Sequence, residues 1–102
     1  MSKTILQINF KFSVTPEKLG EDFGPMAEPL AKVPGLRWKI WSLNPAEGEF
    51  AGIYLFDDPE SIQAYLEGPI VTAVKEHPAV SDISAKQFAV IEEFSAITRG
   101  PV

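Results

Sequence analysis

Residues 50–56 constrain the fold of this chain more than any other segment, because the segment is apolar on both of its faces. It reads Phe-Ala-Gly-Ile-Tyr-Leu-Phe, and successive side chains of a strand point to opposite faces of a sheet. One face therefore carries Phe50, Tyr54 and Phe56, and the other carries smaller apolar residues. A sheet with one wet face would have polar residues at alternate positions, so we expect this strand to be covered on both sides.

The remaining segments predict three more strands and two helical regions. Alternating apolar residues favour strands, and apolar residues three or four positions apart favour helices. The expected strands are 4–12, 36–43, 50–56 and 82–92, and the expected helical regions are 15–31 and 57–77. A polar hairpin loop at 44–49 is expected to join the second and third strands.

Both helical regions have clear start signals and internal breaks. Thr15 and Asp58 have side chains typical of helix N-caps, and a proline follows each of them. Pro25 lies inside the first region and lacks a backbone N–H, so we expect a kink or break near residue 24. Gly68-Pro69 interrupts the second region in the same way.

The order strand, helix, strand, strand, helix, strand is the ferredoxin-like α+β pattern. We therefore expect one domain over residues 1–102, with a four-stranded antiparallel sheet and helices on one face. Two helices cover only one face, so the second apolar face of residues 50–56 predicts a homodimer in which two sheets pack face to face. The apolar tail from Phe94 to Val102 is expected to reach onto the partner.

Charge and composition argue against several classes of partner and site. A net charge of −5 without a cluster of Lys and Arg argues against nucleic acid and against an anionic membrane surface. No apolar stretch is long enough to span a membrane, and residues 1–4 lack the apolar core of a signal peptide, so we expect a cytoplasmic protein. Without cysteine or a pair of histidines, we expect no metal site.

Two segments resemble motifs of the YdhR-like monooxygenase family. Residues 35–42, Gly-Leu-Arg-Trp-Lys-Ile-Trp-Ser, match its G-x-x-W-K-x-W stretch, and residues 52–56, Gly-Ile-Tyr-Leu-Phe, match a second stretch. The likeness continues through residues 6–10, 29–31 and 64–67 and spans residues 5–98. The resemblance implies a dimeric α/β barrel, in a superfamily that includes cofactor-independent oxygenases of aromatic polyketides and haem-degrading enzymes.

On this resemblance we interpret the chain as a cofactor-independent monooxygenase, an oxidoreductase acting on a small aromatic or apolar molecule between the sheet and the helices. Two alternatives stay open. One is haem degradation, because related haem-degrading proteins pair a first-strand asparagine with a histidine near the end of the second helix, where this chain has Asn9 and His77. Those proteins carry a tryptophan on that helix where this chain has Tyr65, and Pro78 is a further departure. The other alternative is a dimer that binds a small ligand without catalysis.

The candidate catalytic residues are Asn9, Trp38, Trp41, Tyr54 and His77. An amide or an indole N–H can hold an oxyanion, and a tyrosine hydroxyl can orient a phenol, although large aromatics are also ordinary core residues. The two tryptophans are three positions apart on one strand, so one should face the helices and one the dimer partner. His77 is the only histidine; it could be a base or a haem ligand, or the cation favoured at a helix C-terminus.

The expected substrate pocket lies on the helix side of the sheet, where aromatic and flexible apolar side chains line small-molecule sites. The candidate substrate-binding residues are Phe10, Phe23, Met26 and Tyr65.

Overall fold

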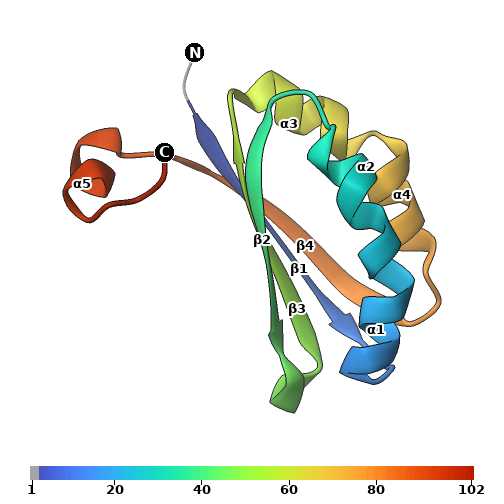
Figure 1. Ribbon diagram of the computed structural model, residues 1–102. Coiled ribbons are helices and arrows are strands. Elements are labelled where there is room, and N and C mark those ends of the chain that lie inside the picture. The colour runs from blue at the N-terminus through green and yellow to red at the C-terminus, as the bar shows by residue number, and fades with distance from the viewer. Residues whose placement is uncertain (1–2) are drawn as a thin grey trace.

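The computed structural model describes residues 3–102 and confirms the predicted ferredoxin-like α+β fold (Figure 1). The strands are β1 (Thr4–Phe12), β2 (Leu36–Asn44), β3 (Glu49–Phe56) and β4 (Val80–Ala89). They form one antiparallel sheet in the order β2-β3-β1-β4, so β2 and β4 are its edges. The α-helices are α1 (Pro16–Phe23), α2 (Ala27–Ala31), α3 (Pro59–Leu66), α4 (Pro69–Glu76) and α5 (Glu92–Ile97), and the 3-10 helices are η1 (Gly24–Met26) and η2 (Pro45–Glu47).

The predicted break in the first helical region is confirmed, and it positions two side chains for the site. α1 ends at Phe23, and η1 carries the chain through Gly24-Pro25 into α2. Phe23 and Met26 therefore lie on either side of the break, and both line the space between the helices and the sheet. The second region is divided in the same way, because Gly68 separates α3 from α4.

The start of α1 depends on Thr15. Its hydroxyl oxygen accepts a hydrogen bond from the backbone N–H of Lys18 at 3.1 Å, and Pro16 takes the first helical position. Replacing Thr15 by alanine is expected to lower the free energy of unfolding by about 1 kcal/mol, because that N–H loses its partner. Urea denaturation measures the change.

Thr72→Ala is the control for this prediction. The Thr72 hydroxyl only donates a hydrogen bond back to the Gly68 carbonyl at the start of α4, at 2.9 Å. Its loss should change the free energy of unfolding by less than about 0.5 kcal/mol. Equal losses in the two variants would contradict the capping role.

The face of the sheet beneath α1 to α4 holds the apolar core (Figure 1). Alternate residues of β1 are buried on this face, namely Leu6, Ile8, Phe10 and Phe12. The register places Tyr54 of β3 beside Leu6, and Phe50 beside Phe10. The alternation predicted for these two central strands is thereby confirmed.

A bulge in β2 decides which of its side chains face the helices. The register with β3 shifts between Leu36 and Trp38, so Arg37 is an extra residue. Beyond the bulge, Lys39 lies opposite Tyr54 and therefore faces the helices, as does Trp41. Trp38 lies opposite Leu55 and faces the other way.

The last strand ends earlier than the sequence pattern suggested. We expected a strand over residues 82–92, whereas β4 spans Val80–Ala89. Ala89 pairs with Thr4, the first residue of β1, so within residues 3–102 the chain beyond Ala89 has no strand to pair with. Glu92 and Glu93 then supply the acidic first turn of α5, which favours a helix there.

The second face of the sheet is only partly covered. We call it the open face, and its residues include Ile5, Gln7, Asn9, Trp38, Ile40, Ile53, Leu55, Lys86 and Phe88. An apolar row crosses all four strands, because Phe88, Ile5, Leu55 and Trp38 are successive neighbours in the register. α5 stands on this side, apart from the other helices (Figure 1), and exposes large apolar side chains.

Candidate active site

A small cavity lies between the sheet and the helices, with a volume of about 30 Å³. We call it the central cavity; its lining is Ile8, Phe10, Phe23, Met26, Leu30, Lys39, Trp41, Phe50, Tyr54, Tyr65, Ile70, Val71, Val74 and Ile83. Its volume holds about one or two water molecules, so an aromatic ligand can enter only if lining side chains move.

A larger groove adjoins the central cavity where α1 and η1 lie over β2 and β3. This side groove has a volume of about 220 Å³, and its apolar lining includes Leu19, Ala27 and Leu43. Phe23, Trp41 and Phe50 line both spaces and so form the wall between them. Trp41 is 39% exposed, which makes it the lining aromatic best placed to move aside for a ligand.

Lys39 brings a charge into this apolar site. Its Nζ atom lies 3.6 Å from the ring centroid of Trp41, 4.7 Å from that of Tyr54 and 5.5 Å from that of Phe50. Burial lowers the pKa of Lys39 from 10.5 to about 7. The three rings act in the opposite sense, because a cation over an aromatic face is stabilised. Sequence reasoning had missed Lys39, although its even spacing from Trp41 on β2 was a usable signal.

Two tyrosines share a hydrogen bond at the back of the central cavity. The hydroxyl groups of Tyr54 and Tyr65 lie 3.0 Å apart, and both side chains are buried. Burial raises the pKa of both tyrosines, and for Tyr54 the neighbouring Tyr65 raises it further. Both hydroxyls therefore stay protonated. Each carries one proton and a single shared bond uses only one, so the pair retains one O–H that can be donated to a ligand oxygen.

Asn9 lies on the open face, away from the central cavity. Its Nδ2 donates to Glu49 at 3.2 Å, and its Oδ1 accepts a hydrogen bond from Gln7 at 3.0 Å. The same residues line a polar hollow of about 310 Å³, together with Ser84, Lys86 and Phe88. The amide of Asn9 is therefore satisfied by a polar network on the open face.

Trp38 also lies on the open face. Its Nε1 donates a hydrogen bond to the carbonyl oxygen of Pro101 at 2.8 Å, which ties the C-terminal tail to β2. The spacing argument for the two tryptophans holds, and Trp41 is the one on the helix side.

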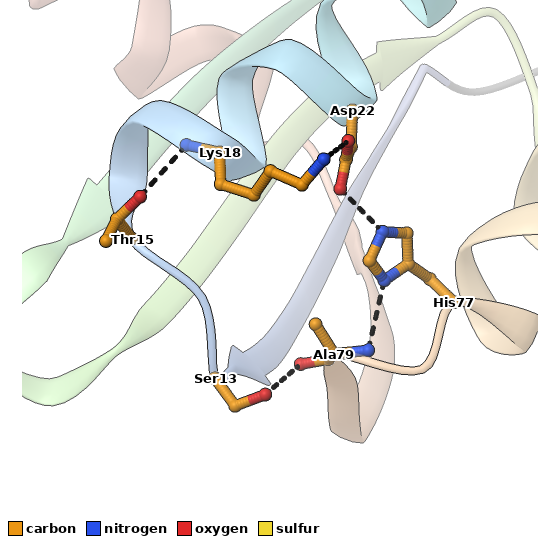
Figure 2. Close-up of polar contacts among 6 residues, drawn as sticks. All are labelled: Ser13, Thr15, Lys18, Asp22, His77 and Ala79. Carbon is orange, nitrogen blue, oxygen red and sulfur yellow. Dashed lines mark hydrogen bonds and ion pairs between the residues drawn. The ribbon is translucent and has the colours of Figure 1, made fainter.

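His77 has a partner that the sequence did not reveal. The Nδ1 atom accepts a hydrogen bond from the backbone N–H of Ala79 at 3.1 Å, so Nε2 carries the proton and donates it to Asp22 at 2.9 Å (Figure 2). The hydrogen bond from His77 to Asp22, and then the one from Lys18, hold the pKa of Asp22 below its usual range. The imidazole thus links the end of α4 to α1, and both of its nitrogen atoms are engaged.

The structure brings six of the nine candidate residues to one place. The central cavity is lined by Phe10, Phe23, Met26, Trp41, Tyr54 and Tyr65. The other three, which are Asn9, Trp38 and His77, are not among its lining residues.

Within residues 3–102, no three His, Asp or Glu side chains gather where a metal ion could bind, and none of the helices is long and apolar enough to cross a bilayer.

A four-stranded antiparallel sheet with one layer of helices over an aromatic cavity defines the ferredoxin-like fold class of this protein. This chain belongs to the family described as "Putative mono-oxygenase ydhR", whose sequence model matches residues 5–101. No curated protein sequence matches the chain.

Solved structures with the same fold include proteins of different activities. A cofactor-independent oxygenase, SnoaB from Streptomyces nogalater, is 17% identical, with a TM-score of 0.70 over 88% of this chain and 94% of that chain. The haem-degrading protein MhuD from Mycobacterium tuberculosis is 20% identical, with a TM-score of 0.66 over 85% and 95%. A dimeric ferredoxin-like protein of unknown function from Thermobifida fusca is 23% identical, with a TM-score of 0.66 over 88% and 93%. At these identities the likeness shows the fold alone.

Proposed function

We propose that this protein is a cofactor-independent monooxygenase that oxidises a small, electron-rich aromatic molecule in the central cavity and the adjoining side groove. The observation that carries the proposal is the wall of the cavity. It is apolar except for the Lys39 amine, the Trp41 indole N–H and the paired hydroxyls of Tyr54 and Tyr65. Membership of the ydhR family supports the reaction class.

Such a site can promote oxidation without supplying electrons of its own. In one balanced case, a CH₂ group beside an electron-rich ring becomes a carbonyl group. One oxygen atom of dioxygen becomes the carbonyl oxygen, and the other leaves as water with both hydrogens of the CH₂ group. The substrate therefore supplies all four electrons that reduce dioxygen. The protein contributes a water-poor cavity and a fixed orientation. The free O–H of the tyrosine pair can donate a hydrogen bond to a developing oxyanion.

We further propose that the functional unit is a homodimer joined through the open faces. Phe88 and Ile40 on this face are 49% and 51% exposed, and a second sheet would cover them. α5 exposes Phe94 and Ile97 on the same side, and these would pack on the partner. The structure from Thermobifida fusca with the same fold is described as dimeric, which supports a dimer.

Haem degradation is the weaker candidate in this structure. A haem site built from Asn9 and His77 needs both side chains in one pocket, with a free histidine nitrogen for the iron. Asn9 is on the open face, and both nitrogen atoms of His77 are hydrogen-bonded. The two residues do not form a haem site here.

Oxygen uptake with a panel of phenols, hydroquinones and anthrone-type compounds tests the proposed function. Wild-type protein should raise uptake above the rate of the substrate alone, with saturation in substrate. The double variant Tyr54→Phe/Tyr65→Phe should lower that rate by about 100-fold, because it removes the oxyanion donor. It should still fold, because both members of the hydrogen-bonded pair become apolar groups of the same shape.

Asn9→Ala serves as the matched control on the other face of the sheet, and it should retain wild-type uptake. No uptake with any member of the panel, together with ligand binding, would favour the non-catalytic binding dimer. Loss of uptake in Asn9→Ala, with retention in the double tyrosine variant, would move the site to the open face and contradict the proposal.

A further inference from the structure

We propose that Lys39 is the base that removes the proton from an acidic phenol or enol substrate, and that its ammonium group then holds the resulting anion. This inference rests on the proposed function, because it names the substrate class for the same cavity. Nothing in the motif G-x-x-W-K-x-W required the lysine to face the helices; the bulge at Arg37 and the pairing of Lys39 with Tyr54 place it there.

The first support is the position of the amine. Lys39 lines the central cavity and also a second surface groove of about 200 Å³ beside α2 and β2, so the residue lies between the core and the surface. Within residues 3–102 it has no carboxylate partner, and its contacts are the faces of Trp41, Tyr54 and Phe50. An amine held among rings without a counterion is suited to a ligand that brings the negative charge.

The second support is the set of groups that surround Lys39. From α2, α3 and α4 the cavity wall supplies only apolar residues and the hydroxyl of Tyr65, and from β3 it supplies Tyr54. Arg37, the nearest cation along β2, is paired with Asp57 at 3.0 Å. The described wall contains no carboxylate that could neutralise Lys39 or repel an anion. An anionic ligand would therefore be the nearest negative charge and would favour the protonated form of Lys39.

The third support is the ease with which the amine changes charge. Burial brings the pKa of Lys39 to about 7, so the neutral amine is present in slightly alkaline solution. Once protonated, the ammonium is stabilised by the ring faces of Trp41 and Tyr54 and by the anion itself. The same residue can thus accept a proton and keep it.

The step is a proton transfer that balances without an oxidant. The O–H bond of the phenol breaks, its proton forms the third N–H bond of Lys39, and a phenolate remains beside an ammonium group. The spare O–H of the tyrosine pair can donate to the phenolate oxygen. A phenolate gives up an electron more readily than a phenol, so this step prepares the substrate for dioxygen. Phenols, hydroquinones and enolised dicarbonyl compounds fit this chemistry, whereas cationic amines do not.

The test uses 2-naphthol without oxygen, so that its outcome does not depend on turnover. The hydroxyl of 2-naphthol is acidic in the same range as the phenol of tyrosine, at about 10, so the probe is un-ionised in water at about pH 8, and its anion absorbs at longer wavelength. With wild-type protein the naphtholate band should appear on binding, with no proton released to the solution. Lys39→Met should bind 2-naphthol without the band. Lys39→Arg is always charged and cannot take up a proton, so it should show the band and release one proton for each molecule bound.

Activity gives the second readout. Lys39→Met should lower the rate of oxygen uptake by about 100-fold or more, the usual contribution of a general base. Lys75→Met, an exposed lysine of α4, should leave the rate unchanged. Wild-type uptake should rise with pH through about 7 as the amine form appears.

The possible results separate the two proposals. A naphtholate band without oxygen uptake from any substrate would sink the proposed function and leave the assignment of Lys39 intact. Oxygen uptake that survives Lys39→Met would overturn the role of Lys39 and leave the proposed function intact. Un-ionised 2-naphthol in the wild-type complex, the same band in Lys39→Met, or no binding up to the solubility limit would each overturn the role of Lys39.

Discussion

Replacing Lys39 by methionine is expected to raise the free energy of unfolding by about 3 kcal/mol near pH 6. The fall in the pKa of Lys39 from 10.5 to about 7 corresponds to at most roughly 5 kcal/mol of disfavoured charge, and about 3 kcal/mol is expected because the side chain is only partly buried. Methionine fills a similar space without a charge and suits an apolar wall. A residue kept at such a cost to stability points to a role in function.

The gain in stability of Lys39→Met should depend on pH, and the direction of this dependence shows whether the buried charge of Lys39 causes it. Below about pH 7, Lys39 is charged in both the folded and the unfolded chain, and the full penalty is present. Between about 7 and 10.5 the unfolded chain binds one more proton than the folded one, so the stability of the wild type rises with pH. The advantage of Lys39→Met should therefore shrink as the pH rises through this window.

Urea denaturation of both proteins at several pH values measures the effect. The protomer concentration must be kept fixed, because association also contributes to stability. Lys75→Met removes an exposed lysine and should differ from the wild type by less than about 0.5 kcal/mol at every pH. A loss of stability in Lys39→Met, or a gain that does not change with pH, would show that Lys39 is not held at an electrostatic cost.

Ile40→Glu is expected to convert the proposed homodimer to monomers at micromolar concentration. Ile40 is 51% exposed on the open face of a single chain, so the substitution should leave the fold of the monomer intact. In the dimer it would place a carboxylate between the two sheets, next to Ile53, where burying the charge costs several kcal/mol. An increase of about 100-fold or more in the dissociation constant follows from a cost of about 3 kcal/mol.

Sedimentation velocity over a range of concentrations measures the dissociation constant. Leu43→Glu is the matched control, because Leu43 is 43% exposed on the same strand but faces the helix side. It should remain as dimeric as the wild type. A monomeric wild-type protein, or the same dissociation constant for Ile40→Glu and the wild type, would exclude the open faces as the interface.

Alternation in the sequence was enough to predict the fold and much of the cavity. The period of two in β1 and β3 predicted which side chains of each strand share a face, and the register then places Phe10 beside Phe50. The proline signals predicted the break after Phe23. Because buried aromatics had to meet between one sheet and one helical layer, Phe10, Phe23, Tyr54 and Tyr65 could be grouped from pattern alone.

What the pattern missed depended on geometry that no local rule supplies. Without the bulge at Arg37, simple alternation from Leu36 would place Lys39 on the open face. The bulge reverses the alternation, so Lys39 faces the helices. Asp22 and His77 are 55 residues apart, and only the packing of α1 against the end of α4 joins them. Asn9 was a catalytic candidate because an amide can hold an oxyanion, although strand parity already placed it on the face opposite Phe10 and therefore away from the cavity.

The two tryptophans of β2 give this protein two optical reporters, one for each face of the sheet. Trp41 lies 3.6 Å from the amine of Lys39, so its emission should respond when a ligand enters the cavity or when that amine changes charge. Trp38 is bonded to the carbonyl of Pro101, so its emission should respond when the tail shifts on the open face. Because the chain has no third tryptophan, W38F and W41F each leave a single fluorophore. Ligand entry and subunit association can therefore be followed separately in one molecule without an added label.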